Sequence, residues 1–430
     1  MGRAVWPTLR RSMFRDLRER IPDRNVWVVY ATIFLLSIAY GLAIALTPIV
    51  LEDRGLLRAE VGQLASFFGL GLVSCAIPAG ALIRRFTARG MLVVCIVGYA
   101  AMIGIFPFLL EYWEMAACRF LDGAFSVGAW VSCETLLLAR SDAKNKAFVT
   151  SLYAIATSIG YVVGPIAAWL LAGTIAAEHT FVVAAVIAAA SSLVALLRLD
   201  ADPPSISAPA LASSAAAPGV GVRGPLELTW AIKMSALATF MTGFFQSAAV
   251  LFLPTYLEHV KHVSQDDTRL VVAFAAGGML LLANPAGRLG DRHGHLFVMR
   301  ALAIAGVATL VSFGAMTSFA VMCLGLLFGG GALLAMAPIS LALQGVIARP
   351  EEYTRSNSIF NVFFASGLLL GPLVSGHLMT AVDDEALLHL FAAMWTVFIV
   401  VSLVFRADDP RAQRPERAVP PGEPAPVEDA

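Results

Sequence analysis

Two stretches of the sequence decide the fold: residues 156–171 read ATSIGYVVGPIAAWLL, and residues 363–378 read FFASGLLLGPLVSGHL. Each has two glycines four positions apart and a proline directly after the second glycine, in otherwise largely apolar surroundings. Small residues let helices approach closely, while a proline inside a helix leaves a carbonyl unpaired and bends the helix. Because the two stretches lie 207 positions apart, they indicate that the chain contains two copies of one unit.

The composition places most of the chain in a membrane. Of its 430 residues, 58% are hydrophobic and only 14% are charged, which is too apolar for a soluble domain of this length. A membrane-spanning helix needs roughly 20 apolar residues, and this length predicts twelve helices. They cover residues 26–51, 61–83, 91–110, 115–138, 147–172 and 179–197 in the first half, and 227–257, 268–286, 296–316, 318–346, 357–380 and 386–405 in the second half.

Basic residues gather in every second loop. One side of the membrane keeps only Arg54, Arg58, Lys261 and Arg269, whereas the other side receives both basic termini and most of the remaining loop cations: Arg84, Arg85, Arg89, Arg140, Lys144, Lys146, Arg198, Arg223, Arg288, Arg292, Arg300, Arg349 and Arg355. Cytoplasmic loops carry the excess of Lys and Arg. We therefore expect a multi-pass protein of the inner or plasma membrane, with both termini in the cytoplasm.

The predicted helices form two six-helix bundles, residues 26–198 and 227–405, joined by a cytoplasmic linker at 199–226. The linker is rich in Pro, Ala, Ser and Gly, which is typical of a flexible connection. Residues 1–25 predict either an amphipathic helix on the membrane surface or a disordered basic tail, and residues 406–430 predict a disordered tail. With six helices per copy, both bundles start on the same side, so they are related by an axis along the membrane normal.

A cytoplasmic loop carries a more specific signal. Residues 287–295 read GRLGDRHGH, and Pro285-Ala286-Gly287 just before this loop matches Pro78-Ala79-Gly80 in the first half. The loop resembles the G-x-x-x-D-R-x-G-R/K motif of the major facilitator superfamily, and the resemblance runs from the first helix to the twelfth. It implies an all-α membrane protein of twelve helices that transports by alternating access. It also implies that the loop closes the cytoplasmic gate, through Gly287, Asp291, Arg292 and Gly294.

The first-half copy of this loop departs from the family pattern. Arg84 stands at the position of the aspartate, Thr87 at the second glycine and Ala88 at the final basic position. Glu134, near the cytoplasmic end of the fourth helix, could reach Arg84, Arg85 or Arg89 and replace the missing acidic partner. Two interpretations stay open for Glu134: a structural ion pair at the gate, or a proton carrier.

Charges inside the membrane are costly and therefore mark functional sites. The fourth helix contains Arg119 and Asp122, three residues apart on one helix face, where they can neutralise each other. Residues Arg119 to Gly123 also resemble the R-x-x-x-G motif of proton-coupled facilitators, whereas the second half has Leu326 and Gly330. If Arg119 turned to another partner, Asp122 would lose its counter-charge and take up a proton. The alternative is a fixed ion pair in the exoplasmic third of the helix.

The substrate site is expected among the helices that usually form the cavity in this family: the first, fourth, seventh and tenth. The candidates are weakly polar side chains on the first, seventh, fifth and eleventh helices, namely Tyr40, Gln246, Tyr161 and Asn361, flanked by Phe67, Phe68, Phe244, Phe245 and Phe364. Such a pocket suits an amphipathic solute better than a sugar or a multiply charged anion. Ordinary core packing of each aromatic ring is the alternative.

The glycine and proline positions of the fifth and eleventh helices resemble a motif prominent in antiporters of the family, and they form a helix-packing motif of Gly160, Gly164, Pro165, Gly367, Gly371 and Pro372. Ala168 and Trp169 stand where that motif often has glycines. We interpret the motif as packing at a moving interface between the halves, and the alternative is ordinary close packing of helices. It favours efflux over uptake.

The predicted function is therefore secondary transport of a small amphipathic solute, coupled to protons and directed outward. The alternative is an importer of an organic acid or amino acid, with Arg119 as the anion ligand. No G-x-x-x-x-G-K-S/T sequence is present to bind a nucleotide. A membrane sensor or an embedded enzyme would need an output module or a convergent set of reactive side chains. We expect no cofactor, metal, nucleic acid or catalysis, and a monomer that contacts lipid, protons and one small-molecule substrate.

Overall fold

The computed structural model describes residues 21–141, 146–202, 223–349 and 352–409, and over these ranges it is built from helices without strands. The predicted surface helix or tail before residue 21, most of the linker, and the tail after residue 409 lie outside the described residues. The all-α prediction is confirmed for the described ranges.

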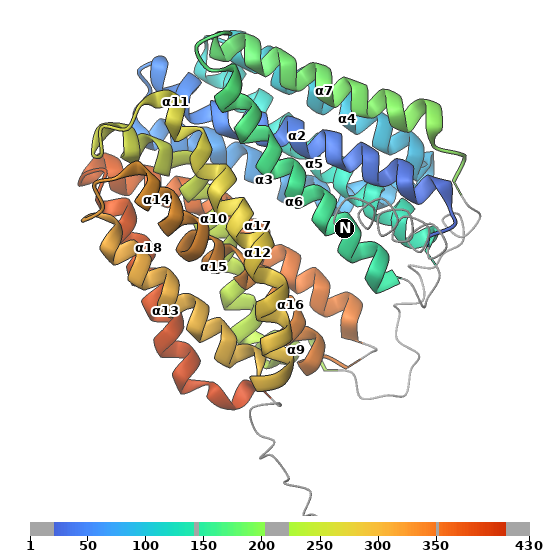
Figure 1. Ribbon diagram of the computed structural model, residues 1–430. Helices are drawn as coiled ribbons and strands as arrows, with labels where there is room; N and C mark the ends of the chain where they lie inside the picture. The colour runs from blue at the N-terminus through green and yellow to red at the C-terminus, as the bar shows by residue number, and fades with distance from the viewer. Residues whose placement is uncertain (1–20, 142–145, 203–222, 350–351, 410–430) are drawn as a thin grey trace, which may run out of the picture.

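The N-terminal bundle contains six long helices, which run antiparallel to their neighbours in sequence (Figure 1). They are α2 (Arg24–Asp53), α3 (Arg58–Phe86), α4 (Ala88–Ile105), α5 (Tyr112–Ala139), α6 (Lys146–Leu171) and α7 (Ala177–Arg198). A short turn, η1 (Phe106–Phe108), follows α4. Asp23 caps the start of α2, because its carboxylate accepts a hydrogen bond of 2.8 Å from the Asn25 amide.

The C-terminal bundle repeats this order with one broken helix. Its elements are α9 (Pro225–Ala231), α10 (Lys233–His259), α11 (Gln265–Thr268), α12 (Leu270–His293), α13 (His295–Phe313), α17 (Tyr353–Ala381), α18 (Ala386–Val404) and the turn η5 (Arg406–Asp408). The tenth span consists of α14 (Phe319–Gly325), a π-helical turn η3 (Leu326–Gly330), α15 (Gly331–Leu334) and α16 (Met336–Ile347). The seventh span begins with a separate short helix, α9, which the sequence did not predict.

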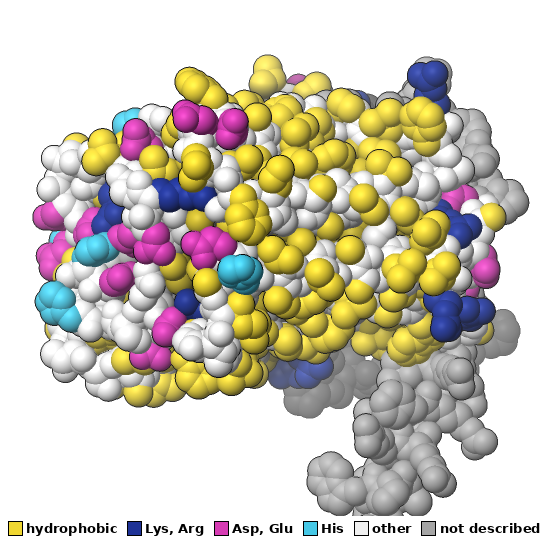
Figure 2. All heavy atoms as spheres, turned by 90° about the horizontal axis from the view of Figure 1, so that it is seen from above, with side chains coloured by type: hydrophobic (Ala, Val, Ile, Leu, Met, Phe, Trp, Pro, Cys, Tyr) yellow, Lys and Arg dark blue, Asp and Glu magenta, His cyan; other side chains and the backbone are white. Residues whose placement is uncertain are grey.

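Eleven helical spans in the described residues are long and apolar enough to cross a membrane. The twelfth is α5, which is 28 residues long but carries four charged side chains: Glu114, Arg119, Asp122 and Glu134. Figure 2 shows the corresponding surface, with apolar side chains over the middle of the molecule and charged side chains gathered toward its two ends. The prediction of twelve transmembrane helices is confirmed.

The repeat is also visible in how the helices touch. A Cβ atom added to Gly71 on α3 would collide with the Phe120 carbonyl oxygen on α5, and one added to Gly278 on α12 would collide with the Leu327 carbonyl oxygen. Both residues of the second contact lie 207 positions after those of the first. The same backbone-to-backbone approach therefore fixes the same helix pair in each bundle.

The loops before α4 and α13 are equally matched. Thr87 and Gly294 stand at equivalent positions, and both have a positive φ, of 123° and 99°. The Asp202 carboxylate then accepts hydrogen bonds from the Ala88 and Arg89 amides at 2.5 and 3.0 Å, while Asp409 accepts one from the Leu296 amide at 2.9 Å. A carboxylate at a helix N-terminus satisfies free amides and interacts favourably with the helix dipole.

The start of the C-terminal bundle is fixed by an ion pair. Arg223 Nη2 lies 2.6 Å from Glu352 Oε2, just before α17, and the Glu352 carboxylate also accepts hydrogen bonds from the Arg223 and Arg349 amides. The hydrogen bond from the Arg223 side chain is the largest cause that lowers the pKa of Glu352 to about 2. This pair attaches the end of the linker to the bundle.

The two bundles meet at one end of the molecule, which we call the distal end because it lies opposite the linker. Figure 1 shows the bundles converging near α11 and diverging toward the end of α7 and the start of α9. A Cβ atom on Gly62 of α3 would collide with the Pro372 carbonyl oxygen of α17. Between α6 and α12, Arg269 Nη1 donates to the Ala168 carbonyl at 2.9 Å. The bundles are thus closed against each other at the distal end.

Candidate functional site

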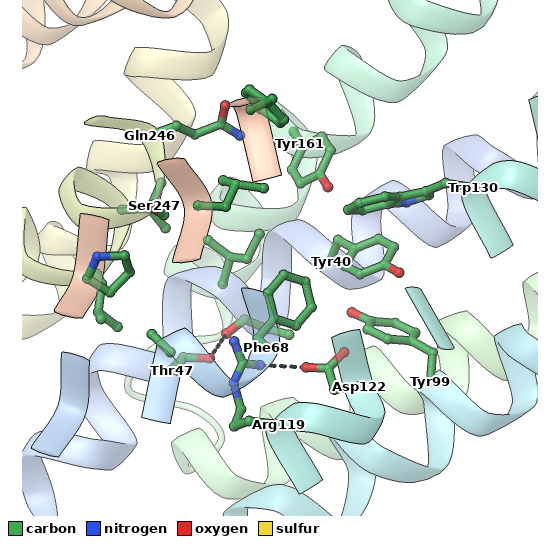
Figure 3. A pocket seen from close by; sticks show the side chains of 18 residues that line it. Tyr40, Thr47, Phe68, Tyr99, Arg119, Asp122, Trp130, Tyr161, Gln246 and Ser247 are labelled. Atoms are coloured by element: carbon green, nitrogen blue, oxygen red, sulfur yellow. Dashed lines mark hydrogen bonds and ion pairs between the residues drawn. The ribbon is translucent and has the colours of Figure 1, made fainter. Parts of the chain in front are cut away.

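A cavity of about 160 Å³ lies between the two bundles (Figure 3). The N-terminal bundle supplies its charged side chains and most of its aromatic ones, and the C-terminal bundle supplies mainly aliphatic ones. The lining includes Tyr40, Thr47, Phe68, Tyr99, Arg119, Asp122, Trp130 and Tyr161 from the first bundle, and Gln246, Ser247, Val250, Leu251, Phe364 and Leu368 from the second.

Arg119 and Asp122 form an ion pair on the cavity side of α5. Arg119 Nη1 lies 2.5 Å from Asp122 Oδ2, and Ser126 Oγ donates to the other carboxylate oxygen at 3.3 Å. Asp122 is only 3% exposed. The Arg119 guanidinium also lies 4.8 Å from the centre of the Phe68 ring, within the range of a cation–π interaction. The helix spacing that predicted this pair thus brings the two charges together at the cavity.

Four aromatic rings form one wall of the cavity beside this pair. The centre of the Tyr40 ring lies 4.2 Å from that of Tyr99, 5.6 Å from that of Trp130 and 6.3 Å from that of Tyr161. The sequence prediction named Tyr40 and Tyr161 but missed the other two. Trp130 could have been found, because residues 119, 122, 126 and 130 recur on one helix face. Tyr99 could not, because its helix was not expected to line the cavity.

Of the other predicted substrate residues, some line the cavity and some lie outside it. Gln246 on α10 lines the cavity, as do the flanking rings Phe68 and Phe364. Asn361 lies on α17 two turns before the cavity residue Leu368, where its side chain is exposed and outside the cavity lining. Of the remaining flanking rings, Phe67 packs edge-on against Trp113, while Phe244 and Phe245 are buried. The tenth span, expected to contribute, supplies none of the described lining residues; α3, α4, α6 and α17 contribute instead.

The second-half gate motif has the expected turn. Gly294 adopts the positive φ that ends α12, and Gly287 and Arg292 lie on the last two turns of that helix. The Asp291 carboxylate lies 3.5 Å from Nε2 of His295, a partner that the sequence interpretation did not name. The role of these residues in closing a gate stays a prediction.

The first-half gate residues are arranged differently. The Arg85 guanidinium lies 5.6 Å from the Phe86 ring, and Arg89 Nη2 donates to the Leu196 carbonyl at 2.6 Å. The side chain of Arg84 lies outside the described residues. Glu134 is exposed on α5, about three turns beyond Asp122, and it has no ion pair among the side chains that the structure describes. Because the side chain of Arg84 is not described, the role of Glu134 as the substitute partner of the loop stays a prediction.

The glycine and proline motif packs helices inside each bundle. Gly160 and Gly164 of α6 lie against Ser37 and Gly41 of α2, with Pro165 also at Gly41; Gly367 and Gly371 of α17 lie against Phe240 and Phe244 of α10. Only Pro372 meets the other bundle, at Gly62. The predicted role at a moving interface between the halves therefore does not describe the glycines, which hold each bundle together.

A network of ionisable side chains joins the bundles at the distal end, and the sequence analysis missed it. We call it the distal network: Glu52, Arg58, His259 and Asp384. Arg58 lies 3.2 Å from Glu52 of its own bundle and 3.5 Å from Asp384 of the other. His259 Nε2 lies 3.1 Å from Glu52, and His259 Nδ1 lies 3.0 Å from Arg58 Nη2. Each bundle thus contributes one carboxylate and one basic side chain to the closed end.

Comparison with known proteins shows which family has this architecture. The family model described as Major Facilitator Superfamily matches residues 29–260 and 235–428. An uncharacterised MFS-type transporter from Enterobacter sp. (strain 638) is 22% identical over 382 residues, covering 89% of this chain and 96% of the relative. Another, from Yersinia pestis (strain Pestoides F), is 24% identical over 399 residues, covering 92% and 99%.

Solved structures show the same fold. A crystal structure of the nucleoside transporter NupG aligns with a TM-score of 0.71 at 14% identity, covering 89% of this chain and 99% of that one. A bacterial homologue of the human lysosomal transporter Spinster, in an inward-facing and occupied conformation, aligns with a TM-score of 0.67 at 16% identity, covering 88% and 95%. At these identities the likeness concerns the fold.

Proposed function

Because this chain belongs to the Major Facilitator Superfamily and is a membrane transporter by family, we propose that it moves a small amphipathic solute outward across the inner membrane, coupled to protons. The observation that carries the proposal is the cavity between the bundles, which holds a buried ion pair beside an aromatic wall. A solute bound there touches both bundles. Rocking of the bundles would therefore change the access to it without moving the site itself.

The Arg119–Asp122 pair is the proposed coupling element. Asp122 is buried, so its negative charge depends on the guanidinium 2.5 Å away. When Arg119 turns toward a bound solute, the carboxylate loses its counter-charge and takes up a proton. When Arg119 returns, the proton is released. This exchange needs no residue outside the cavity.

The linker end of the molecule is the proposed cytoplasmic side. The positive-inside rule assigns the basic loops Arg84–Arg89 and Arg288–Arg292 to the cytoplasm, and these loops lie at that end. The distal end, where the bundles are closed, then faces the exoplasm. The conformation is accordingly one that is shut toward the outside.

Solute-linked proton flux tests this proposal. The purified protein is reconstituted in vesicles containing a pH-sensitive dye and is exposed to a panel of amphipathic compounds and metabolites. We expect at least one compound to drive proton movement in the natural protein, and Asp122→Asn to abolish that movement. Glu114→Gln, which removes an exposed carboxylate from the same helix, is the matched control and should leave proton movement unchanged. Undiminished flux in Asp122→Asn would exclude the carrier role.

Uptake of an organic acid is the second candidate, and the placement of Arg119 in the cavity lining favours it. A guanidinium binds carboxylates through paired hydrogen bonds. Vesicles of defined orientation separate the two directions, because an exporter accumulates solute only where its cytoplasmic side faces the medium. For the importer, Arg119→Ala should abolish accumulation from the opposite orientation.

A further inference from the structure

We propose that the solute is a planar aromatic compound whose polar groups are hydrogen-bond acceptors and which carries no positive charge. This inference rests on the proposed function, since it takes the cavity between the bundles as the transport site. It concerns the chemical class of the solute and is independent of the direction of transport and of proton coupling.

The polar groups left open in the cavity can all donate a hydrogen bond, and one of them can only donate. Among the described residues, the Tyr99 and Tyr161 hydroxyls, the Trp130 indole N–H and the Gln246 amide line the cavity and form no hydrogen bond. The buried Tyr40 ring lies in the same wall. An indole N–H can only donate, and a phenol left without a partner has its O–H to offer. A ligand that supplies acceptors can therefore satisfy all of these groups.

The acceptors of the cavity are mostly engaged. Asp122 is held by Arg119 and Ser126, at 2.5 and 3.3 Å. The Thr47 hydroxyl donates to the Ala43 carbonyl at 2.7 Å, and the Ser247 hydroxyl donates to the Gly243 carbonyl at 2.9 Å. Both hydroxyls are therefore directed at their own helices. A solute rich in N–H donors would have to use the phenol oxygens and the Gln246 oxygen as acceptors, and it would leave the Trp130 indole N–H without an acceptor.

The shape of the walls selects for flat solutes. Tyr40 and Tyr161 are stacked at 25°, and Figure 3 shows these rings with Trp130 and Tyr99 on one side of the pocket. Phe364 adds a ring from the C-terminal bundle, and Val250 and Leu251 add aliphatic surface. Stacked aromatic faces bind another planar ring over a large contact area.

A cationic solute is the main competitor, because aromatic walls attract cations. Arg119 opposes it, since its guanidinium already lies 4.8 Å from the Phe68 ring in the same cavity. A cation that drew Asp122 away would leave the half-buried Arg119 without its counter-charge, which is costly. The pair thus favours neutral or negative solutes over positive ones.

Two probes with one ring system test the proposal. The first is 2-acetylnaphthalene, neutral with a carbonyl acceptor, and the second is 2-naphthylmethylammonium, cationic with donors only. Binding to the full chain in lipid nanodiscs is measured by isothermal titration. We expect the acetyl probe to bind about tenfold more tightly, which corresponds to one or two hydrogen bonds.

The variant Tyr99→Phe/Tyr161→Phe keeps both rings and removes two donors. It should weaken the acetyl probe about tenfold and the ammonium probe clearly less, whereas the control Tyr153→Phe, on α6 outside the lining, should change neither. Equal or tighter binding of the ammonium probe, no binding of either probe, or an unaffected double variant would overturn the inference. Proton flux that depends on Asp122 would survive each of these results, so a failed solute class is distinguishable from a failed transport function.

Discussion

The fourth and tenth spans occupy equivalent places in the two bundles and are built in opposite ways. The fourth, α5, is one continuous helix of 28 residues that carries Arg119 and Asp122 into the cavity. At the equivalent positions the tenth span has Leu326 and Gly329, within a π-helical turn that divides it. One copy of the repeated unit supplies charge to the cavity, and the other supplies none of the described lining residues.

The glycines of the tenth span explain this difference. Residues 325–331 read GLLFGGG, and a Cβ atom on Gly329 would collide with Thr309, while one on Gly331 would meet the backbone of Gly278. Glycine permits such approach but weakens a regular helix, and π-helical turns are rare outside functional or strained places. The tenth span is thus adapted to close packing against α12 and α13. Two copies of one helical arrangement can therefore have different roles: the fourth span carries the charges of the cavity, and the tenth span packs closely against its neighbours.

Substitutions that make α5 resemble the tenth span should have the largest effect on stability and on proton flux. Arg119→Leu leaves Asp122 buried and unpaired, so we expect a loss of about 3–5 kcal/mol at neutral pH. Arg119→Leu/Asp122→Ala should recover most of that stability, yet both variants should lack solute-linked proton flux. Thermal unfolding in nanodiscs and flux in vesicles check the two parts. Equal stability of the single and double variants would show that the pair is not a coupled charge pair.

The shared frame is tested by the matched glycines Gly71 and Gly278. Because each faces a carbonyl oxygen of the neighbouring helix, Gly71→Ala and Gly278→Ala should each destabilise the protein by about 1–3 kcal/mol through overpacking. Gly277→Ala is the control: its added methyl would lie 3.7 Å from Leu327 and should change stability by less than about 0.5 kcal/mol. If only one of the two matched variants is destabilised, the bundles do not share this contact.

The helices, their repeat and the Arg119–Asp122 pair could be predicted from the sequence, because all three depend on local sequence patterns. Span length predicts the helices, and the offset of 207 positions predicts which of them correspond. Arg119 and Asp122 follow from helical spacing alone. The distal network could not be predicted, since Arg58 and Asp384 are 326 residues apart and meet only when the bundles pack. The π-helical turn also escaped prediction, because glycines permit it without requiring it.

In the distal network each bundle contributes one carboxylate and one basic side chain. Asp384→Asn removes the carboxylate of the C-terminal bundle. The change removes the Arg58 contact of 3.5 Å between bundles and keeps the Arg58–Glu52 pair within the first bundle. We expect the distal end to open more often, so that a cysteine placed at Ala59, which binds Thr380 across the interface, is labelled about threefold faster. Lys261→Gln, a nearby cation outside the network, should leave the rate unchanged. A rate that does not respond to Asp384→Asn would deny the network a closing role.

The ion pair at the start of the C-terminal bundle predicts a dependence on pH. The folded-state pKa of Glu352, about 2, lies below the ordinary value of 4.5, so its stabilisation is complete above pH 4.5 and is lost as the pH falls toward 2. Between pH 5 and pH 3, the melting temperature should fall by a few degrees more in the natural protein than in Glu352→Gln. Parallel profiles for the two proteins would show that the pair does not stabilise the fold.

The smallest expected effect concerns Thr87 and Gly294, which both have a positive φ but differ in side chain. A β-branched residue in that region is strained by about 1–2 kcal/mol, whereas glycine is not. Thr87→Gly should therefore raise stability, by slightly less than that amount, because it also loses the hydrogen bond of 3.0 Å from the Gly90 amide to the Thr87 hydroxyl. Gly294→Thr should lower stability by a similar amount. The melting temperatures of both variants test this prediction. Shifts of opposite sign mean that the first bundle has a strained copy of a turn that the second bundle makes with glycine. Shifts of the same sign mean that the two turns are stabilised by different contacts.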